Sequence, residues 1–223
     1  CIKQNASSAF LSAQTVEKCM GKELHIEDFA HSYCVGGLDL SQTTDLTAAC
    51  AVIEKDGRLN VIAHFWMPAE RIEEASARDG VPYGIYVQKG FLSPSGDNFV
   101  DYRDCEKWFT DLVEQHKIYS LKVGYDRYSS QYLVQQMKND GGFLMDDVFQ
   151  GWNMTPAINK LEGVLKEKRL KIGNNPLLRV HLLDTALQKD RMTKRVKIVK
   201  LNENSHIDGV AALLDALIVK DKW

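Results

Sequence analysis

Three short runs of apolar residues, rich in β-branched and aromatic side chains, define the first predicted elements. They cover residues 35–40, 46–53 and 59–66. The last two runs are separated by Glu-Lys-Asp-Gly, a sequence typical of a tight turn. The pattern therefore predicts three strands that pair as an antiparallel meander.

Beyond the meander, apolar positions follow helical spacing in some segments and alternate in others. Pro68 opens a predicted helix at residues 69–77, and residues 81–97, rich in Gly, Pro and Tyr, are predicted as a strand and loop. Asp101 caps a helix that continues to about residue 117. The remaining predicted elements are a strand at 120–125, a helix at 131–138, a strand at 144–150, helices starting at 155 and 176, a strand at 192–201 and a helix at 206–221.

A meander followed by alternating helices and strands predicts an α/β fold with a mixed sheet flanked by helices. This is the element order of ribonuclease H-like folds. A chain of 223 residues, 44% of them hydrophobic, can bury one sizeable core. Residues 1–33 have weak periodicity and are predicted to be a tether with some helix, so the folded domain is expected to span residues 34–223.

Composition limits the environment in which the chain works. The longest apolar stretch, residues 210–219, is interrupted by Asp215 and is too short to span a bilayer. The chain starts without an initiator Met or a secretory leader, which suggests a piece of a longer protein. Its five cysteines are scattered and include no C-x-x-C pair, which argues against a zinc site and a disulfide framework and fits a reducing cytosol.

Charge is unevenly distributed along the chain. Residues 166–200 hold eleven Lys and Arg against three acids, a net charge of +8, whereas the whole chain carries −2. A basic lobe on an acidic body suits a protein that binds a polyanion through one face and keeps a carboxylate site on another. A solvated basic face without a partner is the alternative.

Three aspartates, Asp39, Asp126 and Asp208, each lie at the edge of an apolar run. A carboxylate placed in a buried element costs several kcal/mol unless its charge is compensated. Divalent cations held by all three would compensate it, and carboxylate oxygens with water and phosphate are the ligands that magnesium prefers. The three positions therefore predict a metal-dependent site, of the kind that a nuclease uses.

Each of these aspartates also has a structural interpretation. Asp39 shares a strand face with Val35 and Gly37, where a glycine leaves room for a ligand, but it could instead cap the turn that follows. Asp126 ends a strand that precedes a helix, the edge at which α/β sheets place ligands, but it could simply cap that helix.

Asp208 has the spacing of a capping box with Ser205, so it could return a hydrogen bond at the start of the last helix. Gly209, a poor helix residue, indicates close approach of another backbone or a substrate instead. Asp215, seven residues later, lies on the same helical face as Asp208, either supporting the site or facing solvent. His206 could assist proton transfer or contact phosphate, although as a helical residue it would point away from Asp208.

Five blocks of sequence carry a family resemblance. They are Gly37-Leu-Asp39-Leu-Ser with Asp45-Leu-Thr-Ala48, Gly124-Tyr-Asp126-Arg-Tyr, Gln150-Gly-Trp-Asn-Met-Thr-Pro-Ala, Gly173-Asn-Asn-Pro176-Leu-Leu-Arg and His206-Ile-Asp208-Gly-Val-Ala-Ala-Leu. In this order, from about residue 33 to residue 220, the chain resembles the nuclease domain of tailed-phage large terminases. The resemblance implies a ribonuclease H-like fold and a carboxylate cluster that binds two divalent ions, Mg²⁺ or Mn²⁺.

The resemblance also implies roles for individual residues. Asp39, Asp126 and Asp208 match the metal ligands, with Asp39 expected to bridge the two ions. Asp45 matches the pattern as well, although a structural turn is an equal alternative for it. Asp45, Asp215 and His206 are thus candidates to support the ligands.

Large terminases carry an ATPase motor ahead of the nuclease, and this chain contains no G-x-x-x-x-G-K-[ST] loop. The chain therefore resembles the C-terminal half alone, with residues 1–33 resembling the linker from a missing ATPase region. The implied function is an endonuclease that cuts concatemeric viral double-stranded DNA during genome packaging in the host cytoplasm. Its implied partners are DNA, the ATPase domain of the same parent chain, the small terminase subunit and the portal, and no membrane.

A predicted hairpin around residues 189–200 offers the DNA contact. Four of its basic residues are expected to follow the phosphate backbone without reading bases: Lys194, Arg195, Lys197 and Lys200. A resolvase or ribonuclease H of the same fold and a catalytically inactive DNA- or portal-binding module are the alternative functions.

Overall fold

The computed structural model describes residues 7–40, 46–128 and 131–222. Its centre is a mixed sheet in the order β5-β4-β3-β2-β6-β7. The predicted meander is confirmed, because three long strands pair antiparallel in chain order. They are β2 (Tyr33–Asp39), β3 (Thr47–Lys55) and β4 (Arg58–Met67).

The other strands of this sheet join the meander in parallel. β6 pairs with β2, β7 pairs with β6, and β5 and β8 pair with β4. Their bounds are Leu92–Pro94 for β5, Tyr119–Asp126 for β6, Met145–Val148 for β7 and Leu170–Lys171 for β8. Parallel pairing of β2 with β6 brings the carboxyl ends of both strands to the same edge of the sheet.

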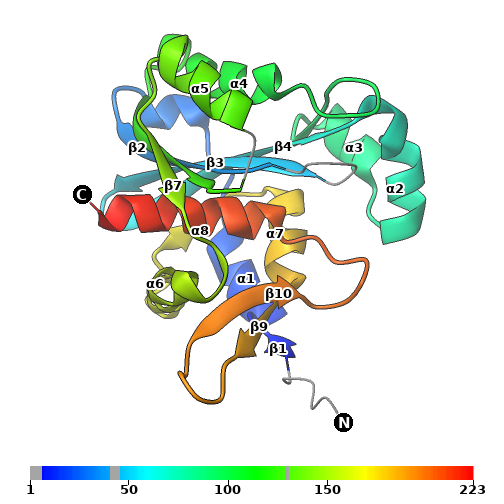
Figure 1. Ribbon diagram of the computed structural model, residues 1–223, viewed down its shortest axis with the longest axis vertical. Coiled ribbons are helices and arrows are strands. Elements are labelled where there is room, and N and C mark those ends of the chain that lie inside the picture. The colour runs from blue at the N-terminus through cyan, green and yellow to red at the C-terminus, as the bar shows by residue number, and fades with distance from the viewer. Residues whose placement is uncertain (1–6, 41–45, 129–130, 223) are drawn as a thin grey trace.

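Helices cover both faces of the sheet (Figure 1). On one face lie α4 (Tyr102–Glu114), α5 (Gln131–Asn139) and the 3₁₀ turn η1 (Ile26–Phe29). On the other lie α8 (Asp208–Asp221), α6 (Thr155–Lys166), α7 (Pro176–Leu183) and α1 (Ala13–Met20). Each face has its own apolar core. The predicted ribonuclease H-like class, a mixed sheet flanked by helices, is confirmed.

The last helix, α8, is the central element of the second layer. Every residue from 209 to 217 is buried, which is the pattern of a helix enclosed on all sides. It packs directly on β2 and β6 because both strands present a glycine to it. A Cβ at Gly37 would lie 1.8 Å from the carbonyl oxygen of Ala212, and one at Gly124 would lie 2.6 Å from that of Asp215.

A second, three-stranded sheet lies below the helices in Figure 1. Its order is β1-β9-β10, all antiparallel, with bounds Ser7–Ala9, Thr185–Lys189 and Val196–Lys200. Residues 8–30, part of the predicted tether, pack closely against the domain: β1 pairs with β9, and α1 buries Val16 and Cys19 in the core. The helix expected in this segment is α1.

The sequence misassigned several elements. Residues 81–97 contain the helix α3 (Tyr83–Gln88) as well as the short strand β5. The strand expected at 192–201 covers only residues 196–200, and its partner β9 and the two-residue β8 were not predicted. The helix predicted at 69–77 is the turn η2 (Ala69–Arg71) followed by α2 (Ile72–Asp79).

Ser205 does not cap α8, contrary to the prediction. Its hydroxyl accepts from the backbone N–H of Asn202, and the helix starts only at Asp208. Thr155 is the first residue of α6, the start expected for this helix, and its hydroxyl bonds to the backbone of Val196. No helix in the described ranges combines the length and the apolar character needed to cross a membrane.

Candidate metal centre

Asp39 and Asp126 are the last residues of two neighbouring parallel strands. The register pairs Leu38 of β2 with Tyr125 of β6, one residue before each aspartate. The two carboxylates therefore lie side by side at the carboxyl edge of the sheet, where α/β folds place their ligands.

Alternation along β2 decides which way Asp39 faces. Leu38 and Leu40 enter the core under α4 and α5, whereas Val35 packs against Val219 of α8. Gly37, on the same strand face as Val35 and Asp39, contacts α8. The sequence interpretation of this glycine as space for a ligand is therefore wrong: the space is filled by a helix, and that helix carries Asp208 and Asp215 toward Asp39.

The electrostatics of Asp39 reflect this convergence. Burial, and then the charges of Asp208 and Asp126, raise the pKa of Asp39 well above its ordinary value. Burial also raises the pKa of Asp126, which accepts a long hydrogen bond of 3.4 Å from the backbone N–H of Tyr128. A bound cation would compensate the negative charge of carboxylates that repel one another at a partly buried site.

Asp215 lies behind this group and has no exposed surface. One of its oxygens accepts from Nε2 of Gln150 at 3.0 Å, and the other is buried without a hydrogen-bond partner. Burial raises the pKa of Asp215 well above its ordinary value, and the charges of Asp39 and Asp126 add to the effect. Gln150 also lowers the pKa of Asp39 against these stronger effects, so it acts on both carboxylates.

Asp208, the first residue of α8, keeps 15% of its side chain exposed. Its Oδ2 lies 3.7 Å from Nδ1 of His206 and 3.9 Å from Nδ1 of His181, too far for hydrogen bonds. Burial acts to raise the pKa of Asp208, but the neighbouring His206 outweighs it and holds that pKa below its ordinary value. Asp208 is thus kept ionised, with one oxygen lacking a hydrogen-bond partner.

The two histidines have different states. His181 is fully buried, and its Nδ1 accepts from the backbone N–H of Gly209 at 3.0 Å, which places the ring proton on Nε2. Burial lowers the pKa of His181 to about 4, so this ring is neutral. Gly209 itself fits against the Phe65 ring, from which a Cβ would be 2.8 Å away. The absence of a side chain at Gly209 therefore makes room for the Phe65 ring, and not for another backbone segment or a substrate.

His206 precedes α8, so the helical angle expected between its side chain and that of Asp208 does not apply. Its Nε2 lies 2.9 Å from Oδ2 of Asp79, the last residue of α2. Asp79 also accepts from Arg78 and from the hydroxyl of Tyr83. Burial alone would lower the pKa of His206, but Asp208 and Asp79 on either side outweigh it and raise that pKa.

These residues fit a divalent cation that brings most of its own ligands. Within the described ranges, no three His, Cys, Asp or Glu side chains already converge closely enough to enclose a metal ion. Asp39, Asp126 and Asp208 can each offer an oxygen from one side and leave the other positions to water and phosphate, which is how Mg²⁺ is commonly held. Asp45 lies outside the described residues.

The basic hairpin extends away from this edge. Its turn is fixed by Asp190, which accepts from the backbone N–H of Met192 and from the hydroxyl of Thr193. Lys194, Arg195 and Lys200 are exposed, whereas Lys197 is half-buried with its Nζ 5.0 Å from the ring centroid of Trp152. The charge of Lys200 acts on Asp39 and lowers its pKa slightly against the stronger effects above.

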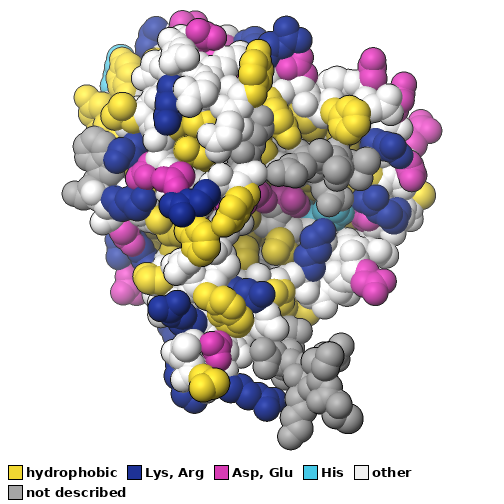
Figure 2. All heavy atoms as spheres, in the orientation of Figure 1, with side chains coloured by type: hydrophobic (Ala, Val, Ile, Leu, Met, Phe, Trp, Pro, Cys, Tyr) yellow, Lys and Arg dark blue, Asp and Glu magenta, His cyan; other side chains and the backbone are white. Residues whose placement is uncertain are grey.

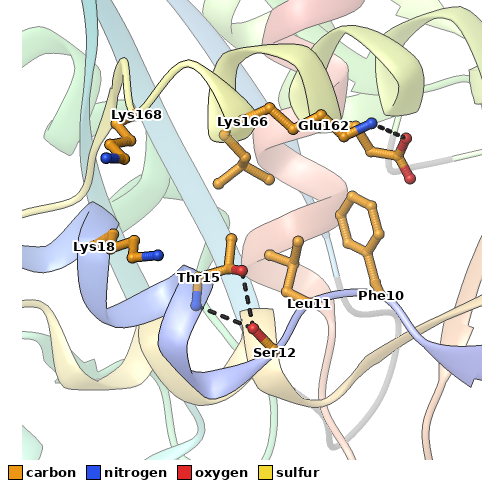
Figure 3. A pocket seen from close by; sticks show the side chains of 9 residues that line it. Phe10, Leu11, Ser12, Thr15, Lys18, Glu162, Lys166 and Lys168 are labelled. Carbon is orange, nitrogen blue, oxygen red and sulfur yellow. Dashed lines mark hydrogen bonds and ion pairs between the residues drawn. The ribbon is translucent and has the colours of Figure 1, made fainter.

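A separate cavity of about 290 Å³ lies between α1 and α6 (Figure 3). It is lined by Phe10, Leu11 and several hydroxyl and ammonium groups. Its one acid, Glu162, pairs with Lys166 at 3.9 Å. Among the described residues, the only carboxylate that lines this cavity is thus paired with a lysine, and the metal-site aspartates do not line it.

Comparison with known proteins identifies relatives of this chain. The large terminase subunit of Enterobacteria phage HK97 is 28% identical over 213 residues, which are 92% of this chain and 40% of that protein. The chain therefore spans less than half of that relative. The HK97 large terminase crystal structure superposes with a TM-score of 0.84 at 26% identity, covering 95% of this chain and 43% of that one.

Two isolated nuclease domains share the fold at lower identity. The large terminase nuclease of thermophilic phage G20c, solved with bound magnesium, gives a TM-score of 0.63 at 12% identity and covers 95% of this chain and 97% of its own. That of bacteriophage SPP1, solved with bound Mn, gives 0.51 at 14%, covering 90% and 94%. The family model described as terminase large subunit, endonuclease domain, matches residues 2–221. The chain therefore belongs to the endonuclease-domain family of terminase large subunits.

Proposed function

We propose that this domain hydrolyses phosphodiester bonds of double-stranded DNA at the site formed by Asp39, Asp126 and Asp208. The observation that carries the proposal is the placement of these carboxylates, from β2, β6 and α8, at one sheet edge, where burial and then the charges of Asp208 and Asp126 raise the pKa of Asp39. Such an arrangement is unfavourable on its own and favourable around divalent cations.

The proposed ligands are Asp39 for both of two ions, Asp126 for one and Asp208 for the other. Mg²⁺ or Mn²⁺ bound there would supply an activated water and neutralise the charge that develops on the scissile phosphate. The G20c and SPP1 nucleases, whose structures hold Mg and Mn, support this choice of ions.

The chain's own residues orient these ligands. Asp79 accepts from His206 and, together with Asp208, raises the pKa of that imidazole, and His206 in turn favours the ionised form of Asp208. Gln150 holds Asp215 through its amide and so fixes the end of β7 against α8. Groups behind metal ligands affect metal affinity and activity because they set ligand orientation and charge.

The hairpin of β9 and β10 is the proposed contact for the DNA backbone. Lys194, Arg195 and Lys200 are exposed on it and can pair with phosphates without reading bases. Sequence-specific cutting would then depend on another subunit or domain.

In the virus, the domain would cut concatemeric DNA during genome packaging. The HK97 relative is a large terminase subunit, of which this chain matches 40%. The proposed partners are an ATPase domain of the same parent chain, linked through the segment before residue 34, together with the small subunit and the portal. The proposed place of action is the host cytoplasm.

Cleavage of supercoiled plasmid tests this function. We expect nicked and linear products with Mg²⁺ or Mn²⁺ and none with EDTA, and duplex DNA should be cut faster than an RNA–DNA hybrid or a four-way junction. Intact plasmid at saturating Mn²⁺, with DNA binding retained, would indicate an inactive binding module. Preferential cutting of the junction or the hybrid would indicate a resolvase or a ribonuclease H.

A further inference from the structure

Two large aromatic side chains are exposed beside the carboxylates. Tyr128, two residues after Asp126, is 68% exposed, and Phe149, next to Gln150, is 44% exposed. Their ring centroids are 6.1 Å apart. The backbone N–H of Tyr128 bonds to Asp126 and the side chain of Gln150, the residue after Phe149, bonds to Asp215, so the backbone near both rings is tied to this group of carboxylates.

Cations accompany these rings. The guanidinium of Arg127 lies 5.2 Å from the ring centroid of Phe149, held there by Asp147 at 2.7 Å. Farther along, Lys197 of the hairpin covers the ring of Trp152 at 5.0 Å. The hydroxyl of Thr155, at the start of α6, binds Val196 and so ties this segment to the hairpin.

The result is a row of aromatic and cationic groups that runs from Asp126 to β10. On the face shown in Figure 2, Lys and Arg side chains lie among hydrophobic and acidic ones. Exposed rings flanked by cations are the elements with which proteins hold single-stranded nucleic acid, since rings stack on bases and cations pair with phosphates. In a closed duplex the base faces are already stacked on one another, so a ring can reach a base face only where a base is unpaired.

We propose that Tyr128 and Phe149 form a stacking platform for an unpaired base of the DNA strand that is being cut. This proposal rests on the proposed nuclease function. It adds that the substrate is DNA whose strands are locally separated at the cleavage point. The strand would pass from the carboxylates across the two rings toward Lys197 and the hairpin.

The test is fluorescence anisotropy with labelled DNA in EDTA, where no cleavage occurs. Its probes are a single-stranded 12-mer, the same strand with abasic sites at every second position, and the matching duplex. The variant is Tyr128→Ala with Phe149→Ala. Tyr132→Ala is the matched control, because Tyr132 is 73% exposed on α5 and lies near Arg103 of α4. Tyr128→Phe keeps the ring and should keep binding.

We expect the double variant to lose between about fivefold and a hundredfold in affinity for the single strand, and less than about twofold for the duplex. The abasic strand should bind wild type about as weakly as the normal strand binds the variant. An unchanged single-strand affinity, or equal losses for single strand and duplex, would overturn the proposal. Because binding is measured without metal, this test gives a result even if the domain has no nuclease activity. Conversely, if the two rings do not bind a base, the plasmid-cleavage test of the proposed function is unaffected.

Discussion

Asp39 reaches its place because the residue two positions earlier has no side chain. A Cβ at Gly37 would lie 1.8 Å from the carbonyl oxygen of Ala212 and 2.8 Å from the backbone nitrogen of Ala216, and backbone atoms of a buried helix cannot move aside cheaply. We expect Gly37→Ala to lower the free energy of unfolding by roughly 1–3 kcal/mol or more and to displace α8 from the sheet. Urea unfolding measures the loss.

Gly163→Ala is the matched control for this experiment. Gly163 lies inside α6, and a Cβ there would meet nothing within 4 Å. The same substitution should therefore raise the free energy of unfolding by up to about 1 kcal/mol, since alanine is the better helix residue. Similar effects at both glycines would contradict the packing account.

His64 makes the stability of the domain depend on pH. Burial lowers its pKa to about 4, and its Nε2 lies 2.8 Å from Oγ of Ser93. The unfolded chain binds this proton near pH 6.5, so the stabilisation is complete above that pH and is lost as the pH falls toward 4. As the pH falls from 6.5 to 4, the melting temperature of His64→Gln should decrease less than that of wild type. His25→Gln, at an exposed histidine, should behave as wild type. Parallel curves for all three proteins would refute the assignment.

At the residue scale, the sequence revealed those site residues that local sequence context marks. Asp39, Asp126 and Asp208 each end or begin an element, and this position is visible in the hydrophobic pattern. Asp215 and His206 were also candidates from the sequence, but their partners Gln150 and Asp79 were not, because these partners are distant in the chain: Gln150 and Asp215 are 65 residues apart, and His206 and Asp79 are 127 apart. Whether the aspartates bind metal stays a prediction.

At the scale of elements, the hairpin of β9 and β10 carries the DNA-binding prediction. Neutralising Lys194, Arg195 and Lys200 should weaken binding about equally for every duplex sequence and flatten the log–log salt dependence by roughly 0.9 per lost phosphate contact. Lys197 is best changed separately, because its alanine variant also loses the contact with Trp152. Anisotropy from low to moderate salt gives the slope.

A charge-matched control separates the hairpin from general electrostatics. Lys22, Lys89 and Lys138 are also exposed and lie on other segments. Their triple alanine variant should keep most of the wild-type slope. If both triple variants lower the slope by the same amount, DNA does not use the hairpin in particular.

Long, regular elements were predictable, and short ones were not. The meander and β6 followed from their apolar runs, and α4 and α5 from periodicity, since each of these helices buries one clear face. α3 has six residues and β8 has two, too few for a period to be recognised. The start of α8 was misplaced because Ser205 binds Asn202 instead, and the backbone N–H of His206 donates to Asp184.

At the scale of the whole molecule, the metal site should contribute to stability. Ligands that bind only the folded state stabilise it by mass action, so millimolar Mn²⁺ should raise the melting temperature of the metal-free protein. The increase should vanish in the variant with Asp39→Asn and Asp208→Asn. A Mn²⁺-induced increase that survives in the double variant would place the cation elsewhere.

The central claim is that Asp39 stands at the centre of a metal-dependent nuclease, between Asp126 on the neighbouring strand and Asp208 on α8. The most direct measurement is the rate of plasmid nicking by wild type and by Asp39→Asn side by side at saturating Mn²⁺, with circular dichroism to establish equal folding. The account predicts that the variant folds as wild type and that its cleavage is abolished. Nicking by the folded variant at the wild-type rate would contradict it.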